Sequence, residues 1–284
     1  MPARADDIAR MTSLDVSRVT ALIEETAAEE VLPRWRALAA GDVRRKSDGD
    51  LVTVADEACE ARLSRRLLDL LPGSVVVGEE AAHAEPKLLA RLKEAAPAWV
   101  IDPVDGTVNF SEGRPAFAVM VALARAGQVL ASWIHEPVAG RTAVAEAGQG
   151  AWIGSRRLTA AKAAPVGSMR GTLHAGNSIG AELAQRVRER RERVGAIKSL
   201  RCAGAEYLRL AAGEMHYTLF SRMMPWDHAP GILIHREAGG WARTLDDRPY
   251  DPAEFAGPGL LMAPDAESWQ ALHAALFAPD PIAV

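Results

Sequence analysis

The stretch "WVIDPVDGTVNF", residues 99–110, constrains the fold of this chain more than any other feature. Its apolar start is typical of a buried strand, whereas Asp102, Pro103, Asp105 and Gly106 break strands or form turns. A chain that ends a strand with two aspartates and then turns sharply places charge at the edge of its core. This charge must be balanced by something outside the strand.

Two further acidic groups also lie at boundaries between predicted elements. Glu79 and Glu80 follow the short apolar strand "SVVV", and Asp227 follows "MMPW" at the start of a predicted helix. In open α/β sheets ligands collect at such strand ends and helix starts. We therefore expect these acids to converge in one crevice with the aspartates of the 99–110 segment.

Converging carboxylates need cations or protons. Two of them about 4 Å apart repel by roughly 4 kcal/mol at an effective dielectric constant near 20. Mg²⁺ balances such charge because it prefers hard oxygen ligands and leaves positions for substrate phosphates. Gly106, Thr107 and Val108 can start a helix whose free amides face an anion. The segment therefore predicts a combined metal and phosphate site.

Apolar spacing predicts the surrounding elements. A long amphipathic helix is expected over 16–38, a loop over 41–53, a second helix over 56–71 and an antiparallel meander over 116–154. Later helices are expected in "AGAEYLRLAAG" and "WDHAPGILIHREA", with a strand in "GTLHAG" between them and the meander. This mixture favours an α/β protein.

Composition excludes several classes of function. The 284 residues carry a formal net charge of −4, which disfavours nucleic acid as a polymeric partner. No apolar run is long enough to span a membrane, and residues 1–16 do not resemble a secretory leader, so we expect a cytoplasmic protein. The two cysteines and the seven histidines show no zinc-binding spacing.

Four segments together resemble the inositol monophosphatase family, which comprises Mg²⁺-dependent, lithium-sensitive sugar-phosphate phosphatases. They are "KSDGDLVTVAD" (46–56), "GEE" (78–80), "WVIDPVDGTVNF" (99–110) and "WDHAPGILIHREAGG" (226–240). The resemblance implies alternating helix and sheet layers, with a metal cleft between an N-terminal α+β half (1–155) and a C-terminal α/β half (156–284). It also implies a phosphoric monoester hydrolase that forms a homodimer.

The resemblance implies two or three bound Mg²⁺ ions. Glu79, Asp102 and the backbone carbonyl of Val104 would hold the first ion. Asp102, Asp105 and Asp227 would hold the second, and a third, weaker ion would lie near Glu79.

The resemblance also assigns catalytic roles. A water molecule would attack phosphorus in line. Thr107, oriented by Asp56, and Glu79 would position this water, and Glu79 would also remove its proton. Gly106 and Thr107 would contact the phosphate. Glu80 is either a supporting residue or merely solvated.

Two further positions stay open at this stage. Lys46 either lies near the metals or is an exposed lysine without a role. His228 follows Asp227, but neighbouring side chains on a helix point about 100° apart, which disfavours it as a ligand.

Substrate contacts are expected from Asp105 and from the small residues Ala203, Gly204 and Ala205, although small residues also serve close helix packing. Family members that act on inositol phosphate carry an acid seven positions before the residue that corresponds to Asp227. This chain has Phe220 there, and a phenyl ring cannot accept a hydroxyl hydrogen bond. Inositol specificity is therefore in doubt.

The sequence thus predicts Mg²⁺-dependent hydrolysis of a small phosphomonoester. Within the family, the alternatives are a histidinol-phosphate phosphatase, a 3'-nucleotide phosphatase and a sugar bisphosphatase. A non-catalytic binding module that keeps the fold is an alternative of another class, as is metal-free carboxylate catalysis.

Overall fold

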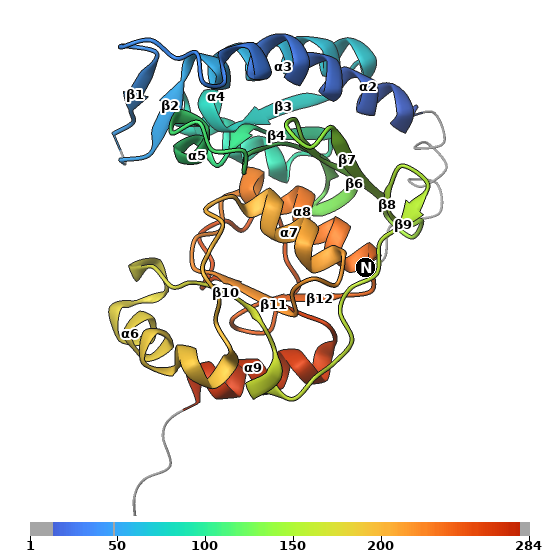
Figure 1. Cartoon of the computed structure of the whole chain (residues 1–284). Coiled ribbons are helices and arrows are strands. Elements are labelled where there is room, and N and C mark those ends of the chain that lie inside the picture. The colour runs from blue at the N-terminus through green and yellow to red at the C-terminus, as the bar shows by residue number, and fades with distance from the viewer. Residues whose placement is uncertain (1–13, 48, 279–284) are drawn as a thin grey trace, which may run out of the picture.

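The computed structural model describes residues 14–47 and 49–278 of the chain. Helices and sheets alternate in five layers, with a helical layer at the top, at the centre and at the bottom (Figure 1). This arrangement confirms the predicted layered α/β fold. Residues 1–13, on which most of the argument against a secretory leader rests, lie outside the described residues.

The first sheet has seven strands in the order β3-β4-β5-β6-β7-β8-β9. β3 and β4 are parallel, and each later pair is antiparallel, which confirms the meander. The strands are β3 (Val75–Gly78), β4 (Ala98–Asp105), β5 (Ala118–Arg125), β6 (Gln128–Glu136), β7 (Arg141–Glu146), β8 (Gly150–Ile153) and β9 (Arg156–Arg157).

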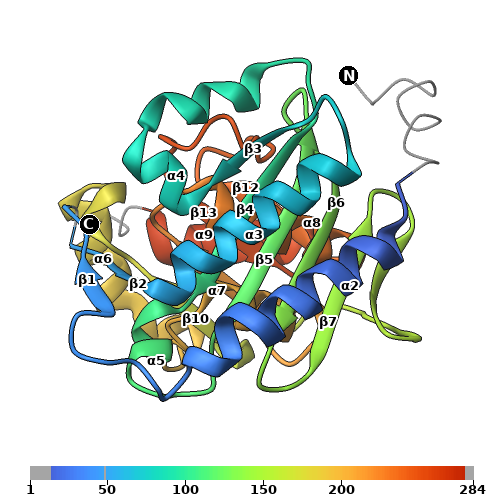
Figure 2. The same cartoon turned by 90° about the horizontal axis from the view of Figure 1, so that it is seen from above.

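Both faces of this sheet are buried. The helices α2 (Val16–Thr26) and α3 (Val54–Leu70) lie across one face (Figure 2). Because successive side chains of a strand point to opposite faces, Trp99 and Ile101 pack with these helices, while Val100 packs on the other side.

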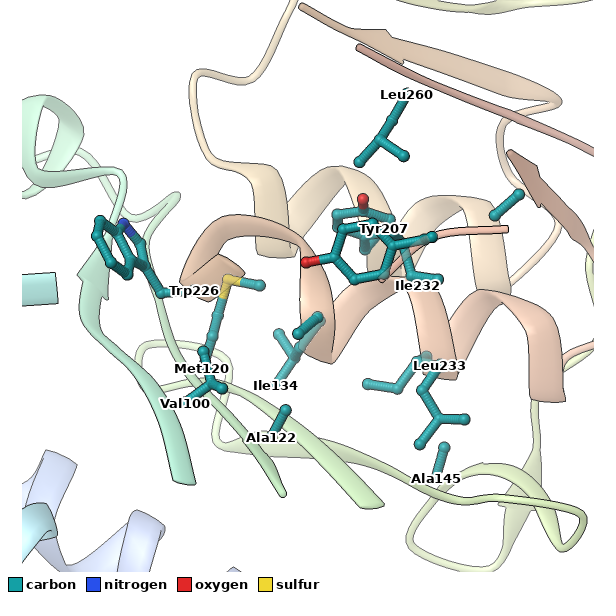
Figure 3. Packing of buried hydrophobic residues seen from close by; sticks show 14 of the residues in the cluster. Val100, Met120, Ala122, Ile134, Ala145, Tyr207, Trp226, Ile232, Leu233 and Leu260 are labelled. Carbon is teal, nitrogen blue, oxygen red and sulfur yellow. The ribbon is translucent and has the colours of Figure 1, made fainter. Parts of the chain in front are cut away.

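The opposite face is covered by α7 (Ala203–Ala211) and α8 (Pro225–Glu237). Figure 3 shows Ile232 and Leu233 of α8 close to Ile134 and Ala145 of the sheet. Beyond these helices lies a four-stranded sheet in the order β10-β11-β13-β12, covered by α6 and α9 (Figure 1). Its elements are β10 (Gly171–His174), α6 (Ala181–Arg190), β11 (Tyr217–Phe220), β12 (Trp241–Thr244), β13 (Leu260–Ala263) and α9 (Ala266–Phe277).

Short elements connect the layers. They are β1 (Val43–Arg45), β2 (Leu51–Thr53), α4 (Glu79–Ala84), α5 (Thr107–Ser111), a π-helical turn (Ala27–Val31) and the 3₁₀ helices Leu32–Arg34, Pro86–Lys93, Val166–Ser168, Asn177–Ile179 and Arg191–Val194. The predicted helix over 16–38 was too long. Its α-helical hydrogen bonding changes after Thr26 to a π-helical turn and then to a 3₁₀ turn, and the backbone becomes extended at Trp35.

The seven-stranded sheet lies before residue 158 and the four-stranded sheet after residue 170. The division into halves at residue 155 stays a prediction, because α7 and α8 come from the later segment and pack against the first sheet. In the described part of the chain, each helix is too short or too polar to cross a membrane.

Candidate active site

A cavity of about 200 Å³ collects the acids of the predicted site. Five carboxylates line it, together with backbone and side-chain groups of the turn after β4; the lining residues are Asp50, Leu51, Glu79, Asp102, Val104, Asp105, Gly106, Thr107, Val108, Arg201 and Asp227. The predicted convergence of Glu79, Asp102, Asp105 and Asp227 is therefore seen in the structure. We call this space the carboxylate cavity.

Strand pairing explains why Glu79 and Asp102 meet. β3 and β4 are parallel, and Gly78 lies beside Ile101, so the next residue of each strand reaches the same sheet edge. Gly78 is required here because a Cβ atom would lie 2.3 Å from the carboxylate carbon of Glu60. That buried carboxylate accepts hydrogen bonds from the amides of Glu80 and Ala81, both 2.8 Å long, and so fixes the start of α4.

The turn after β4 orients the two aspartates. Asp102 is 1% exposed, and its Oδ1 accepts a hydrogen bond from the amide of Val104 at 3.1 Å. Gly106 then adopts a φ of 84°, where a Cβ would come within 2.9 Å of the Ala116 carbonyl oxygen. Only glycine fits this left-handed, crowded position without strain.

Asp105 is held from the other half of the chain. Its carboxylate accepts hydrogen bonds from the amides of Ala203 at 3.1 Å and Gly204 at 2.6 Å, and from the thiol of Cys202 at 3.0 Å. These groups form the start of α7, a nine-residue helix. Ala203 and Gly204 thus lie beside the cavity, but their amides serve Asp105, and Ala205 is buried. Their contact with substrate stays a prediction.

Electrostatics at the cavity are unfavourable without cations. Burial raises the pKa of Asp102, and the charges of Glu79 and Asp105 raise it further. Burial likewise raises the pKa of Asp227, in the first turn of α8, and again Glu79 contributes. For Asp105, burial raises the pKa although hydrogen bonds from α7 oppose the shift. These three aspartates therefore have too little positive charge around them for all of them to be ionised easily.

Thr107 lies where a hydroxyl can be oriented by the chain. Its Oγ1 is 3.0 Å from the Val104 carbonyl oxygen and 3.4 Å from Oδ1 of Asp56. The other oxygen of Asp56 accepts hydrogen bonds from the backbone and hydroxyl of Thr53, in the capping box of α3. Burial raises the pKa of Asp56 to about 7. The predicted Thr107–Asp56 partnership thus has a direct geometric basis.

Lys46 is not the exposed, idle lysine that the sequence also allowed. Its side chain is 4% exposed, and its Nζ lies 2.7 Å from carboxylate oxygens of both Glu79 and Glu80. Burial alone would lower the pKa of Lys46, but the two glutamates raise it. Burial also raises the pKa of Glu80 to about 8. Glu80 is therefore paired, rather than merely solvated.

Two aromatic positions lie outside the carboxylate cavity. Phe220 is 6% exposed and stacks on His174 at a centroid distance of 4.6 Å, with Tyr207 and His228 also in contact. His228 bonds the Tyr207 hydroxyl through Nδ1 at 3.0 Å and the Arg222 carbonyl through Nε2 at 2.8 Å. Both nitrogens of His228 are thus engaged by the protein, which argues against a ligand role.

Comparisons with known proteins show the family and the fold of the chain. The sequence model of the inositol monophosphatase family matches residues 14–278. The chain belongs to the inositol monophosphatase family. Membership makes it a phosphoric monoester hydrolase, and the family is generally metal-dependent.

Individual relatives fit this membership. An inositol-1-monophosphatase of Rhizobium meliloti is 32% identical over 209 residues, covering 72% of this chain and 76% of the relative. A fructose-1,6-bisphosphatase/inositol-1-monophosphatase of Thermotoga maritima is 28% identical, covering 67% and 70%. The solved structure of extragenic suppressor protein suhB from Bartonella henselae shares the fold, with a TM-score of 0.79, 23% identity and coverage of 93% and 98%.

Three residues at or beside the carboxylate cavity were missed by the analysis of the sequence. Glu60 fixes α4, and the exposed Arg201 lines the carboxylate cavity. Asp50 also lines it and is ion-paired with Arg222 at 2.6 Å, which joins the β1–β2 hairpin to the segment before α8. The signal for Asp50 was its place in the "KSDGDLVTVAD" segment, whereas Glu60 and Arg201 had none.

Proposed function

We propose that the chain hydrolyses a small phosphomonoester with the help of Mg²⁺. The observation that carries the proposal is the convergence of Glu79, Asp102, Asp105 and Asp227 on one small cavity. The raised pKa values of Asp102, Asp105 and Asp227 indicate that positive charge is needed before an anionic substrate can enter.

The donor set fits Mg²⁺ better than a softer metal. The groups at the cavity are carboxylate and carbonyl oxygens, the ligands that Mg²⁺ prefers, while the neighbouring His228 is fully engaged elsewhere. Within residues 14–47 and 49–278, no three acidic, histidine or cysteine side chains already stand in a coordinating arrangement. Small side-chain movements of the four acids would be needed on binding, including release of Glu79 from Lys46.

In the proposed reaction, two or three ions would be held by Glu79, Asp102, Asp105, Asp227 and the Val104 carbonyl. When bound, the ions neutralise phosphate charge and lower the pKa of the attacking water. The chain contributes alignment.

Thr107 and Asp56 orient the water, with the Thr107 hydroxyl fixed between two acceptors. Glu79 accepts the water's proton, and the backbone at Gly106 and Thr107 faces the phosphate. Positioning and charge neutralisation are the main protein contributions in phosphoryl transfer.

The alcohol part of the substrate is a separate question. We propose that Asp105 and the start of α7 contact this alcohol part. Phe220 would form an apolar wall on the side of the alcohol part that lies farther from the phosphate. Phe220 lies on β11 beside His228, one residue from Asp227, but its ring is covered by His174 and Tyr207. A site without an acid at this position should prefer less hydroxylated alcohols over inositol.

A sugar bisphosphate is the second candidate substrate. It is favoured by the similarity to the Thermotoga maritima relative, whose name includes fructose-1,6-bisphosphatase. We also propose inhibition by lithium, a cytoplasmic location and a homodimer, as the family resemblance implies.

A phosphate-release screen tests the function directly. The purified protein is assayed with Mg²⁺ against inositol 1-phosphate, histidinol phosphate, 3'-AMP, fructose 1,6-bisphosphate and an aryl phosphate. We expect turnover of at least one substrate, its loss in excess chelator and its recovery when Mg²⁺ is restored. Full activity in chelator would overturn the metal assignment, and no turnover of any phosphomonoester would favour a binding module.

Phe220→Glu is the matched test of the substrate pocket. It should raise kcat/KM for inositol phosphate, because a carboxylate can accept hydrogen bonds from hydroxyl groups, and lower kcat/KM for the aryl phosphate. The change should be modest, because an apolar wall lowers kcat/KM for a hydroxylated ligand only by a factor of roughly 10². An unchanged ratio would place Phe220 outside the pocket.

A further inference from the structure

A second and larger cavity lies apart from the active site. Its volume is about 670 Å³, within the range of small-molecule sites. It is bounded by the turn between β5 and β6 (126–129), by α8 and by the segment 244–251. It shares no lining residue with the carboxylate cavity. We call it the α8 cavity.

Two polar groups at the α8 cavity have no partner within the described part of the chain. The guanidinium of Arg236 makes neither a hydrogen bond nor an ion pair with any residue that the structure describes. The hydroxyl of Tyr250 is buried and also lacks a hydrogen-bond partner among these residues. Leaving a buried hydroxyl unpaired costs about 1–3 kcal/mol. Both groups are therefore available to a ligand.

The acids around the α8 cavity are already engaged. Both carboxylate oxygens of Glu237 accept backbone hydrogen bonds, one from Gly148 and one from Gly150, each 2.8 Å long. Glu254 is ion-paired with Lys93 at 3.3 Å. The carboxylate oxygens of Glu237 and Glu254 thus have donors of their own, whereas the guanidinium of Arg236 has no partner among the described residues.

The two remaining charged residues of the lining, Asp251 and Arg248, also have partners. Asp251 accepts a hydrogen bond from the amide of Ala253 at 2.8 Å, and Arg248 is bound to Asp246 at 2.6 Å. Arg236 is consequently the cation of the lining that has not been neutralised within the described part of the chain.

The floor of the α8 cavity is apolar. It is formed by Val129 of β6, by Met223, by Ile232 and Leu233 of α8, and by Tyr250. Figure 3 shows Leu233 extending toward the first sheet. A ligand that fills this space gains by burying apolar surface, at about 25 cal/mol per Å².

We propose that the α8 cavity binds a small organic anion with an apolar body, such as an aromatic carboxylate or sulfonate. Arg236 pairs with the anionic group, Tyr250 donates its hydroxyl hydrogen, and the apolar body lies on Ile232 and Leu233. The site is independent of the phosphatase reaction and does not rest on the proposed function.

The probe for this site is 8-anilinonaphthalene-1-sulfonate, which joins a sulfonate to aromatic rings and fluoresces when bound. Titration of the native full chain should show saturable binding. Displacement by 2-naphthoate should be efficient, whereas the cation 2-naphthylmethylamine should compete at least about tenfold less well, because a charge-assisted hydrogen bond is lost.

Charge reversal at one residue locates the site. Arg236→Glu should weaken binding of the probe about tenfold or more, and Arg236→Lys should retain most of the affinity. Arg65→Glu is the matched control, because Arg65 is an exposed arginine on the outer helix α3 and the charge change is the same. Equal weakening in both charge-reversal variants would overturn the proposal.

A steric variant gives a second, independent test. Ala147 is an exposed residue at the cavity wall, and Ala147→Trp places an indole at this wall while leaving Arg236 intact. We expect binding of the probe to fall in this variant and to be unaffected by Asp102→Asn. Unchanged binding in Ala147→Trp, or loss of binding in Asp102→Asn, would show that the anion binds elsewhere.

Discussion

Two buried carboxylates of this protein differ in how they are satisfied. Glu206, on α7, is 0% exposed and accepts hydrogen bonds from Thr172, His174, Ser199, Thr218 and the amide of Leu200. Asp102 is equally buried.

Asp102, however, accepts one hydrogen bond, from Val104, among the interactions of the described residues. Burial alone would raise the pKa of Glu206, but His174 and Thr172 lower it, whereas the pKa of Asp102 is raised. A buried acid with sufficient donors stabilises the fold, whereas an acid without them is poised to bind a cation.

Removing the charge of Asp102 gives the largest expected effect on catalysis. Asp102→Asn should lower kcat by about 10³-fold or more, because an electrostatic contribution to the transition state is lost. Its melting temperature in chelator should stay unchanged or rise, since repulsion is relieved. Steady-state kinetics and a thermal melt test both points. Near-normal turnover would remove Asp102 from the site.

Thr107→Ala also changes the region around Asp102, and its effect on catalysis should be smaller than that of Asp102→Asn. We expect kcat to fall by about 10²-fold with little change in KM, because aligning the nucleophile acts on the transition state. The Asp56 carboxylate keeps its hydrogen bonds from Thr53 in this variant, so the melting temperature should stay close to that of the wild type. A change confined to KM would make Thr107 a binding residue.

Binding of Mg²⁺ at the carboxylates around Asp102 should raise the stability of the folded protein measurably. At a concentration of 100 times Kd, a bound ion adds about 2.7 kcal/mol to the free energy of unfolding. The melting temperature of the wild type should rise on addition of Mg²⁺, and that of Asp102→Asn should rise much less. Equal responses would place the ions away from Asp102.

Glu206→Gln should give the smallest effect on activity and a clear loss of stability. An amide cannot accept from all five donors, so we expect the free energy of unfolding to fall by about 1–3 kcal/mol. Urea unfolding measures this loss, and activity should keep the Mg²⁺ dependence of the wild type. Unaltered unfolding would contradict the assigned role of the network.

The sequence predicted the acids of the site because each one follows from local rules. Asp102 and Asp105 end a strand, and Asp227 lies in the first turn of a helix, positions that local patterns reveal. Their convergence could be predicted because parallel strands end at one sheet edge. The carboxylate cavity therefore follows from elements with clear periodicity.

Other parts of the site depend on contacts between distant segments. Lys46 reaches Glu79, and Cys202 reaches Asp105 from 97 positions along the chain. Neither spacing nor composition encodes such a contact, since many solvated lysines and buried cysteines look the same in sequence. The end of the first helix was missed for a different reason, because apolar spacing continues to Leu38 while the backbone becomes extended at Trp35 and adopts a positive φ at Arg36.

The central position of α8 has a consequence during synthesis. The first sheet ends at residue 157, but one of its faces is covered by a helix that ends at Glu237, about 80 residues later. At 5–20 residues per second, a ribosome needs roughly 4–16 s to make that stretch. For this interval the nascent chain presents an uncovered apolar face, and we expect chaperones to protect it until α8 has left the exit tunnel.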